Sequence, residues 1–93
     1  MALSIDDIKV EQLSFEEAQK RGVTEWSIWT KEIATFDWTY DSRETCYIVE
    51  GSVIVEANGK SVTLGEGDFV KFPKGLNCLW RIKDPIKKYY QFN

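Results

Sequence analysis

The sequence predicts an all-β fold, either a sandwich or a barrel, with one short helix near the N-terminus. Short runs of β-forming residues recur along the chain, and turn residues separate them about every 8–12 residues. Asn58-Gly59 lies between two alternating runs, which is typical of a tight β-hairpin. Crossover helices, which a parallel sheet requires, have no matching pattern in the sequence. We therefore expect seven or eight antiparallel strands.

The N-terminal part combines an edge strand and the helix. Residues 5–13 are expected to form a short edge strand. Ser14 then precedes the segment "FEEAQKRG" as a helix cap, and Glu17, three residues later, completes a capping box. Gly22 is a typical helix stop. These signals predict a helix over residues 15–21.

Strand patterns dominate from Glu25 onward. "EWSIWTKEI" and "ETCYIVEG" are rich in β-formers, and "SVIVEANGKSVTL" is expected to be the hairpin. "GEGDFVKFPKG" is expected to be a turn, a short strand and a second turn set by Pro73 and Gly75. The segments "NCLWRI" and "IKKYYQF" predict two further strands, separated by Asp84-Pro85.

Length and composition predict one domain over residues 1–93. The chain is 43% hydrophobic and 14% aromatic, and so few residues cannot build two cores. The net charge is −3 and no basic block is present, so a nucleic-acid partner is not expected.

The cysteines and the N-terminus predict a cellular location. Cys46 and Cys78 are the only cysteines, and without a signal peptide they indicate reduced thiols rather than a disulfide framework. The N-terminus has no sustained apolar region, which excludes a secretory signal and a membrane span. We therefore expect a soluble cytoplasmic protein with no membrane partner.

Two spaced motifs carry a resemblance to a known superfamily. Glu44 is followed after six residues by Gly51, and Gly67 is followed after five residues by Pro73, with Gly75 completing Pro-x-Gly. This spacing resembles the two signature motifs of the cupins, which are small antiparallel jelly-roll barrels. The segments "FPKGLNCLW" and "FDWTYD" are most similar to the very small cupins grouped with ureidoglycine aminohydrolase. The resemblance implies a jelly-roll barrel.

The residues at the metal-ligand positions differ from the superfamily pattern. Trp38, Tyr40 and Cys78 stand where the motifs have histidines, and the chain contains no histidine. Of the superfamily's metal ligands, Glu44 alone is retained. Trp has no lone pair to offer a metal, and the phenol of Tyr is a poor ligand near neutral pH. We therefore expect no metal and no cofactor, and we do not expect the metal-dependent aminohydrolase reaction.

Strand alternation predicts which side chains face the inside of the barrel. If Glu44 points inward, Cys46 and Ile48 should follow it. The last strand should add either Lys88 and Tyr90 or Lys87 and Tyr89. The predicted pocket residues are Phe36, Trp38, Tyr40, Glu44, Cys46, Cys78 and Trp80, together with Lys88 and Tyr90.

Three functional interpretations remain open from the sequence. The first is a metal-free pocket that binds a small amine- or ureide-like molecule, because aromatic rings around a carboxylate favour such groups. The second is an enzyme of the ureidoglycine aminohydrolase-like group, with Glu44 as general acid or base and Cys78 as nucleophile. The third is a structural homodimer that associates through outward Tyr47, Val49 and Leu79. In a purely structural alternative, the rings fill the core and Glu44 hydrogen-bonds to them.

Overall fold

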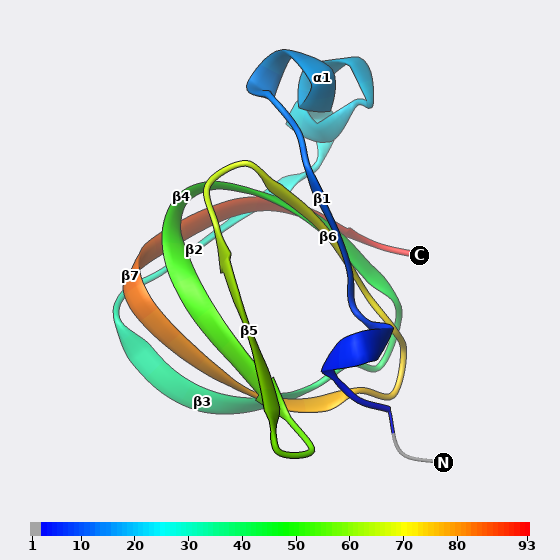
Figure 1. The fold of residues 1–93 in the computed structure, drawn as a ribbon. Helices are drawn as coiled ribbons and strands as arrows, with labels where there is room; N and C mark the ends of the chain where they lie inside the picture. The colour runs from blue at the N-terminus through cyan, green and yellow to red at the C-terminus, as the bar shows by residue number, and fades with distance from the viewer. Residues whose placement is uncertain (1–2) are drawn as a thin grey trace.

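The computed structural model describes residues 3–93 as an antiparallel jelly roll (Figure 1). The all-β class and the single N-terminal α-helix predicted from the sequence are confirmed. The elements in chain order are η1 (Ile5–Asp7), β1 (Lys9–Gln12), α1 (Phe15–Lys20), η2 (Val23–Glu25), β2 (Ser27–Lys31), β3 (Ala34–Thr39), β4 (Glu44–Ala57), β5 (Lys60–Gly65), β6 (Asp68–Phe72) and β7 (Asn77–Phe92).

Two long strands, β4 and β7, lie next to each other in the middle of the strand order. They pair with each other along most of their length, from Glu44 opposite Phe92 to Glu56 opposite Leu79. The first half of β4 pairs with β6 and its second half with β5. The first half of β7 pairs with β3 and its second half with β2. The strand order is β1-β6-β4-β7-β2, with β5 beside β4 and β3 beside β7. Figure 1 shows the resulting curved walls around a common interior. Inward side chains from β4 and β7 therefore meet in one core.

The expected break between two C-terminal strands at Asp84-Pro85 is wrong. β7 continues through both residues, and the ladder with β4 absorbs them by shifts of register near Gly51. Proline is tolerated at such a bulge because no ladder hydrogen bond is required of it there. Gly51 has φ of 88°, and a Cβ at this position would lie 2.2 Å from the carbonyl oxygen of Pro85. The sequence "EGS" therefore marks a bend within one strand, β4, rather than a gap between two.

The local signals near the N-terminus and at the hairpin are largely confirmed. Ser14 and Glu17 form the capping box of α1, and Gly22 follows the helix with φ of 84°. Asn58 and Gly59 both have positive φ between Ala57 and Lys60, which form the last pair of the hairpin. Residues 5–13, expected to be one edge strand, instead divide into η1 and the four-residue β1. Within residues 3–93, no helix has the length and hydrophobicity that a membrane crossing needs.

A second, smaller core lies outside the barrel wall beneath α1, which stands above the barrel in Figure 1. Tyr47 points away from the interior, as alternation predicts, but it is only 3% exposed. Its hydroxyl donates a hydrogen bond of 2.9 Å to the carbonyl of Leu13. The expectation that Tyr47 belongs to an exposed patch is therefore wrong, because the N-terminal segment covers it. The cluster consists of Leu13, Ala18, Val23, Tyr47 and Phe69.

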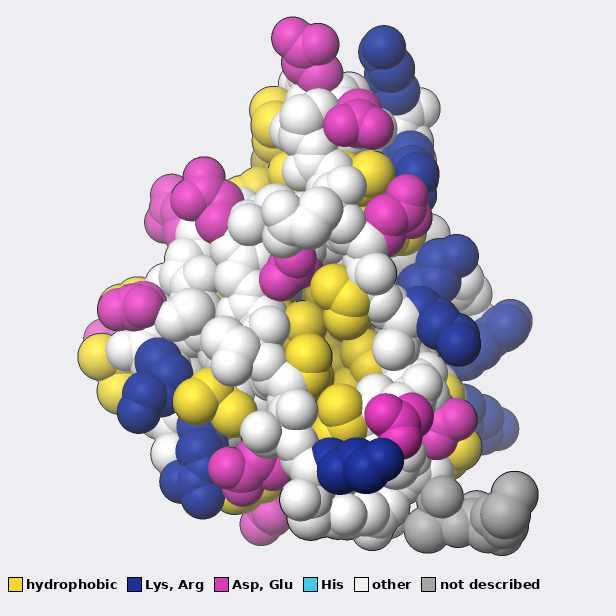
Figure 2. All heavy atoms as spheres, in the orientation of Figure 1, with side chains coloured by type: hydrophobic (Ala, Val, Ile, Leu, Met, Phe, Trp, Pro, Cys, Tyr) yellow, Lys and Arg dark blue, Asp and Glu magenta, His cyan; other side chains and the backbone are white. Residues whose placement is uncertain are grey.

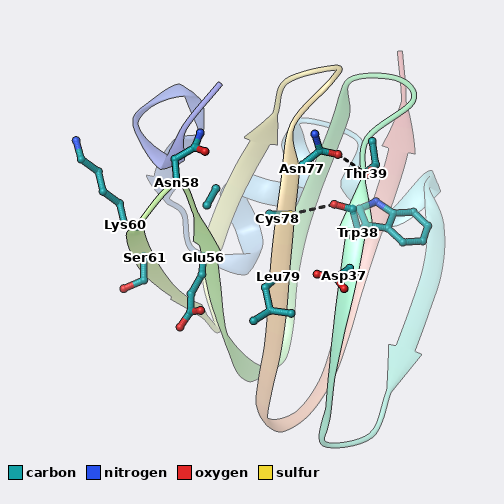
Figure 3. Close-up of a pocket in the computed structure, with 12 residues that line it drawn as sticks. Asp37, Trp38, Thr39, Glu56, Asn58, Lys60, Ser61, Asn77, Cys78 and Leu79 are labelled. Carbon is teal, nitrogen blue, oxygen red and sulfur yellow. Dashed lines mark hydrogen bonds between the residues drawn. The ribbon is translucent and has the colours of Figure 1, made fainter. Parts of the chain in front are cut away.

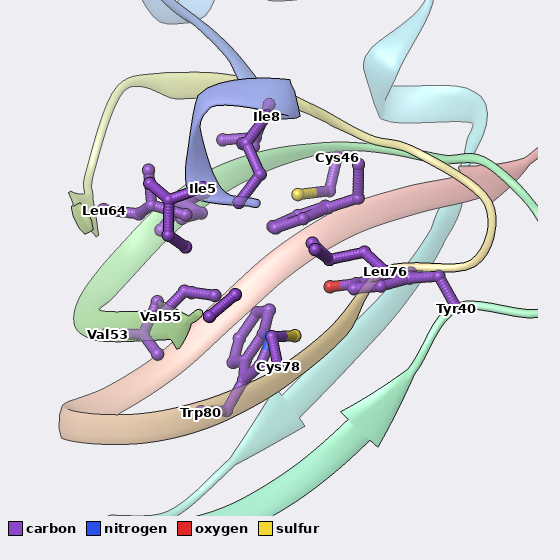
Figure 4. Packing of buried hydrophobic residues seen from close by; sticks show 14 of the residues in the cluster. Ile5, Ile8, Tyr40, Cys46, Val53, Val55, Leu64, Leu76, Cys78 and Trp80 are labelled. Atoms are coloured by element: carbon purple, nitrogen blue, oxygen red, sulfur yellow. The ribbon is translucent and has the colours of Figure 1, made fainter. Parts of the chain in front are cut away.

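The main core fills the barrel and is closed on one side by η1. Figure 4 shows side chains from η1, β4, β5 and β7 meeting in this interior, with Ile5 beside Leu64. In Figure 2, hydrophobic side chains gather in the middle of the face, between β5 and β1. η1 is tied to the hairpin tip by an ion pair of 2.6 Å between Asp6 and Lys60. The N-terminal turn therefore helps to shield the core between the two edge strands.

Replacing Gly51 by alanine should destabilise the protein much more than replacing Gly59. Both glycines have positive φ, but the new Cβ overlaps backbone at Gly51 and meets nothing within 4 Å at Gly59. We expect Gly51→Ala to lower the free energy of unfolding by at least about 3 kcal/mol, and Gly59→Ala by about 1–2 kcal/mol. Urea denaturation followed by tryptophan fluorescence measures both values. Equal losses of unfolding free energy in the two variants would contradict the close approach of the Pro85 backbone to Gly51.

Candidate functional site

A cavity of about 280 Å³ opens into the barrel and is walled mainly by aromatic rings. Seven of the predicted pocket residues line it, and Trp29 and Phe92 complete the wall. Trp38 and Phe92 lie about half exposed at 46% and 52%, whereas Tyr40 and Trp80 are buried at 2% each. The lining residues are Trp29, Phe36, Trp38, Tyr40, Glu44, Trp80, Lys88, Tyr90 and Phe92.

An ion pair between Glu44 and Lys88 lies within this aromatic wall. Nζ of Lys88 donates a hydrogen bond of 2.6 Å to Oε2 of Glu44. The two side chains are only 7% and 4% exposed, so water screens their charges weakly. Glu44 begins β4 and Lys88 lies on the paired half of β7, so the sheet brings the two together. Lys88 thus settles the choice left open for the last strand, and Tyr89 instead packs against the outer cluster.

Aromatic rings surround the ammonium group of Lys88. Nζ lies 4.9 Å from the ring centroid of Trp29 and 4.8 Å from that of Trp80. The ring of Tyr90 is 6.0 Å away. Ring faces are electron-rich and attract a cation at these distances, most strongly where water is excluded. The cage expected for the cation of a ligand is therefore occupied by the protein's own lysine.

Two buried hydrogen-bond donors at the cavity have no acceptor among residues 3–93. They are the hydroxyl of Tyr40 and the indole N–H of Trp80. The indole N–H lies near the hydroxyl of Tyr40 and the thiol of Cys78 and, against the larger effect of burial, acts to lower the pKa of both, although neither contact has the geometry of a good hydrogen bond. Burial raises the pKa of Tyr40 far above its usual range, so its hydroxyl keeps its proton. Buried polar groups are nearly always paired, so these two donors are unusual among the described residues.

The turn predicted at Pro73 and Gly75 holds Tyr40 in place. The backbone N–H of Gly75 donates to the carbonyl of Tyr40 at 2.7 Å, and the N–H of Tyr40 donates to Leu76 at 3.0 Å. The phenol ring stacks on Phe72 with centroids 4.7 Å apart. These contacts fix the ring of Tyr40, which lines the cavity, from both backbone and side chain.

The two thiols are placed differently from the sequence expectation. Cys46 is fully buried in the main core, and Cys78 donates a hydrogen bond of 3.6 Å to the carbonyl of Trp38 (Figures 3 and 4). Neither is among the residues that line the aromatic cavity. Burial raises the pKa of Cys46 to about 12 and that of Cys78 to about 11. Both therefore remain protonated at neutral pH, which disfavours a nucleophilic role.

Sequence reasoning did not place Trp29 or Phe92 at the cavity. Alternation put Trp29 on the same face as Ser27 and Lys31, but it did not say which face of "EWSIWTKEI" points inward. The structure settles this, because Trp29 packs edge-on against Trp80 with centroids 6.0 Å apart. Phe92 follows Lys88 and Tyr90 at intervals of two residues on the same strand, so alternation predicts that it faces the cavity as they do.

The donor set of the cavity does not fit a metal ion. Glu44 is its one carboxylate among the described residues, and its Oε2 is bound to the ammonium of Lys88. A metal bound to Glu44 would lie close to this fixed positive charge and would be repelled by it. Within residues 3–93, no group of three or more His, Cys, Asp or Glu side chains could hold a metal. The cavity therefore lacks a ligand set for metal chemistry among the residues described.

A second, more polar hollow of about 680 Å³ lies beside the hairpin tip and the end of β3 (Figure 3). Thr39 and Asn77, which are paired neighbours on β3 and β7, lie at one edge of it, and Thr39 donates a hydrogen bond of 2.6 Å to Asn77. Trp38 contributes to the lining of both this hollow and the aromatic cavity, and in Figure 3 its indole points away from the hairpin. The remaining lining residues are Asp37, Glu56, Ala57, Asn58, Gly59, Lys60, Ser61, Cys78 and Leu79.

A jelly-roll barrel with an aromatic internal site is the architecture of a small cupin. The model of the EutQ-like cupin domain family matches residues 18–90, so the chain belongs to this family. The resemblance drawn from the sequence motifs is therefore confirmed at the level of the cupin domain.

Relatives and solved structures agree with this assignment. A DUF861 family protein from Thermotoga maritima has a TM-score of 0.87 and 44% identity, covering 92% of this chain and 99% of that one. The EutQ protein of Clostridium difficile has a TM-score of 0.64 and 22% identity, covering 89% and 64%, and supports the fold alone. Acetate kinase EutQ from Clostridioides difficile (strain 630) is 29% identical over 60% of this chain. The match spans 36% of that relative, about a third of its length.

Breaking the buried ion pair from one side should be costly, and removing both partners should be cheaper. We expect Lys88→Met to lower the free energy of unfolding by about 3–5 kcal/mol, because it leaves the Glu44 carboxylate buried and unpaired. The double variant Glu44→Gln, Lys88→Met should regain part of this loss. Urea denaturation of Lys88→Met, Glu44→Gln and the double variant gives the coupling energy between the two side chains. Asp6→Ala, which breaks an exposed ion pair, is the control and should change stability little.

The Cys78 thiol should alkylate slowly at neutral pH and faster as pH rises. Its pKa is raised from 9.0 to about 11, so the thiolate fraction at pH 7 falls roughly a hundredfold. Iodoacetamide labelling at several pH values, resolved by mass spectrometry, measures this rate. The same thiol in urea-unfolded protein is the control. If the alkylation rate of the folded protein instead rose with an apparent pKa at or below that of an ordinary thiol, Cys78 would again be a candidate nucleophile.

Proposed function

We propose that this protein binds a small planar organic molecule of the ureide type in the aromatic cavity, without a metal. The observation that carries the proposal is the pair of buried donors, on Tyr40 and Trp80, that lack an acceptor among the described residues. Leaving each of them unpaired costs about 1–3 kcal/mol. Both atoms are buried from solvent, so a ligand oxygen reaches them through a small shift of the surrounding side chains, and the hydrogen bond then recovers this energy.

The polar groups of the cavity match both kinds of atom in a ureide. A ureide carbonyl oxygen is an acceptor for Tyr40 and Trp80, and ureide N–H groups are donors. The hydrogen bond from Lys88 uses Oε2 of Glu44, so Oε1 can accept a ligand N–H. The aromatic walls, including Phe36 stacked on Trp80 with ring planes 21° apart, suit a flat ligand.

The same geometry favours a ureide over an amine. A ligand ammonium would seek the carboxylate of Glu44 and the faces of the surrounding rings. Lys88 already fills that position, so a second cation there would meet a like charge at short range. A neutral ligand avoids this repulsion. The resemblance to the ureidoglycine aminohydrolase-like cupins supports the same ligand class.

An enzymatic function through Glu44 and Cys78 is less well supported by the site. Cys78 lies outside the lining of the cavity, and its raised pKa keeps it as a thiol. The acetate kinase activity named for the EutQ relative is not adopted for this chain, which matches about a third of that protein.

Tyr40→Phe should weaken ligand binding while leaving the protein as stable or slightly more stable. The variant keeps the ring that stacks on Phe72 and removes only the unpaired hydroxyl. We expect the dissociation constant for allantoin, used as the ureide probe, to rise about tenfold, which corresponds to the loss of one hydrogen bond. Isothermal titration calorimetry measures the affinity, and thermal unfolding measures the stability.

Tyr47→Phe is the matched control, because its hydroxyl bonds to Leu13 outside the barrel. This variant should lose stability and keep its affinity for allantoin. A panel of other ureides, with 2-phenylethylamine as the amine comparison, extends the test. Failure of every ureide to bind wild-type protein, or preferential binding of the amine, would refute the proposed ligand class.

A further inference from the structure

The amine of Lys88 is placed for a reaction that the non-covalent proposal does not use. Among the described residues that line the cavity, Lys88 alone carries an amine. We propose that Lys88 condenses with the aldehyde or ketone group of a small ligand to form an imine. The inference rests on the proposed function only in requiring that small planar molecules enter this cavity.

The surroundings of Lys88 supply what a carbonyl-capturing lysine needs. Its side chain is 7% exposed and borders a cavity large enough for a small ring compound. Oε2 of Glu44 is 2.6 Å from Nζ, a distance at which a proton can pass between them. When Glu44 takes this proton, the amine becomes neutral and can act as the nucleophile.

The condensation balances with groups present in the cavity. Glu44 takes a proton from the ammonium, and the nitrogen lone pair forms a C–N bond to the carbonyl carbon. The carbonyl oxygen then receives a proton from Glu44 and becomes the hydroxyl of a carbinolamine. A proton from the nitrogen passes through Glu44 to this hydroxyl, the C–O bond breaks, and water leaves. The sum is carbonyl compound plus ammonium giving protonated imine plus water, with Glu44 again a carboxylate.

The protonated imine keeps the positive charge where the structure already stabilises one. Its nitrogen is the former Nζ, so it remains near Glu44 and the rings of Trp29 and Trp80. Carboxylate pairing and ring faces favour this cation as they favour the ammonium. Tyr40 and Trp80, whose donors have no partner of good geometry among residues 3–93, line the same cavity. The polar groups of the site thus have roles both before and after condensation.

Reductive trapping tests the proposal on wild-type protein. Benzaldehyde is a flat probe, and sodium cyanoborohydride converts its protonated imine into a stable benzyl amine. We expect peptide mapping to locate the benzyl group on Lys88, with labelling on the order of tenfold faster than at any exposed lysine. Lys31 is the internal control, because its Nζ also lies near a ring, that of Phe36 at 5.6 Å, but the side chain is exposed.

Two variants separate the reaction from non-specific labelling. Lys88→Arg keeps the charge but has no nucleophilic amine, so it should lose the fast phase. Glu44→Gln should slow labelling at Lys88 while exposed lysines react as before, with circular dichroism reporting that each variant is folded. Labelling spread over exposed lysines with Lys88 unmodified in wild-type protein would overturn the proposal. If allantoin binds and Lys88 is not trapped, the imine alone fails; if Lys88 is trapped and no ureide binds, the ureide proposal alone fails.

Discussion

The buried ion pair between Glu44 and Lys88 is the constraint on which the site depends. Two opposite charges removed from water cost several kcal/mol each unless they meet in good geometry. At 2.6 Å they do, and the rings of Trp29 and Trp80 replace part of the lost solvation of the ammonium. The aromatic residues of the cavity therefore act as the environment that makes a charged pair tolerable, rather than as simple filling.

The architecture of the barrel is what brings this pair together. β4 and β7 run side by side through both walls, so residues 44 positions apart in the chain meet on adjacent strands. Such long strands can curve around a core only where the ladder yields, and the bulge at Gly51 and Pro85 supplies that point. The same two strands consequently line both the apolar interior that η1 helps to shield and the aromatic cavity.

Local chemistry made much of this structure predictable from the sequence. The capping box at Ser14, the turn at Asn58-Gly59 and the alternation after Glu44 each depend on neighbours a few residues away. The continuity of β7 through Pro85 and the burial of Tyr47 depend on tertiary contacts instead. The same holds for the partner of Glu44: alternation offered two registers for the last strand, and only the folded sheet selects Lys88.

Three tryptophans, Trp29, Trp38 and Trp80, line the aromatic cavity, and they differ in how much solvent they meet. Trp38 is about half exposed, at 46%, whereas Trp80 is buried, at 2%. A molecule that enters the cavity changes the polarity around these chromophores, most of all around the solvent-exposed Trp38. The tryptophan emission of the protein is thus an intrinsic optical reporter of whether the cavity is occupied.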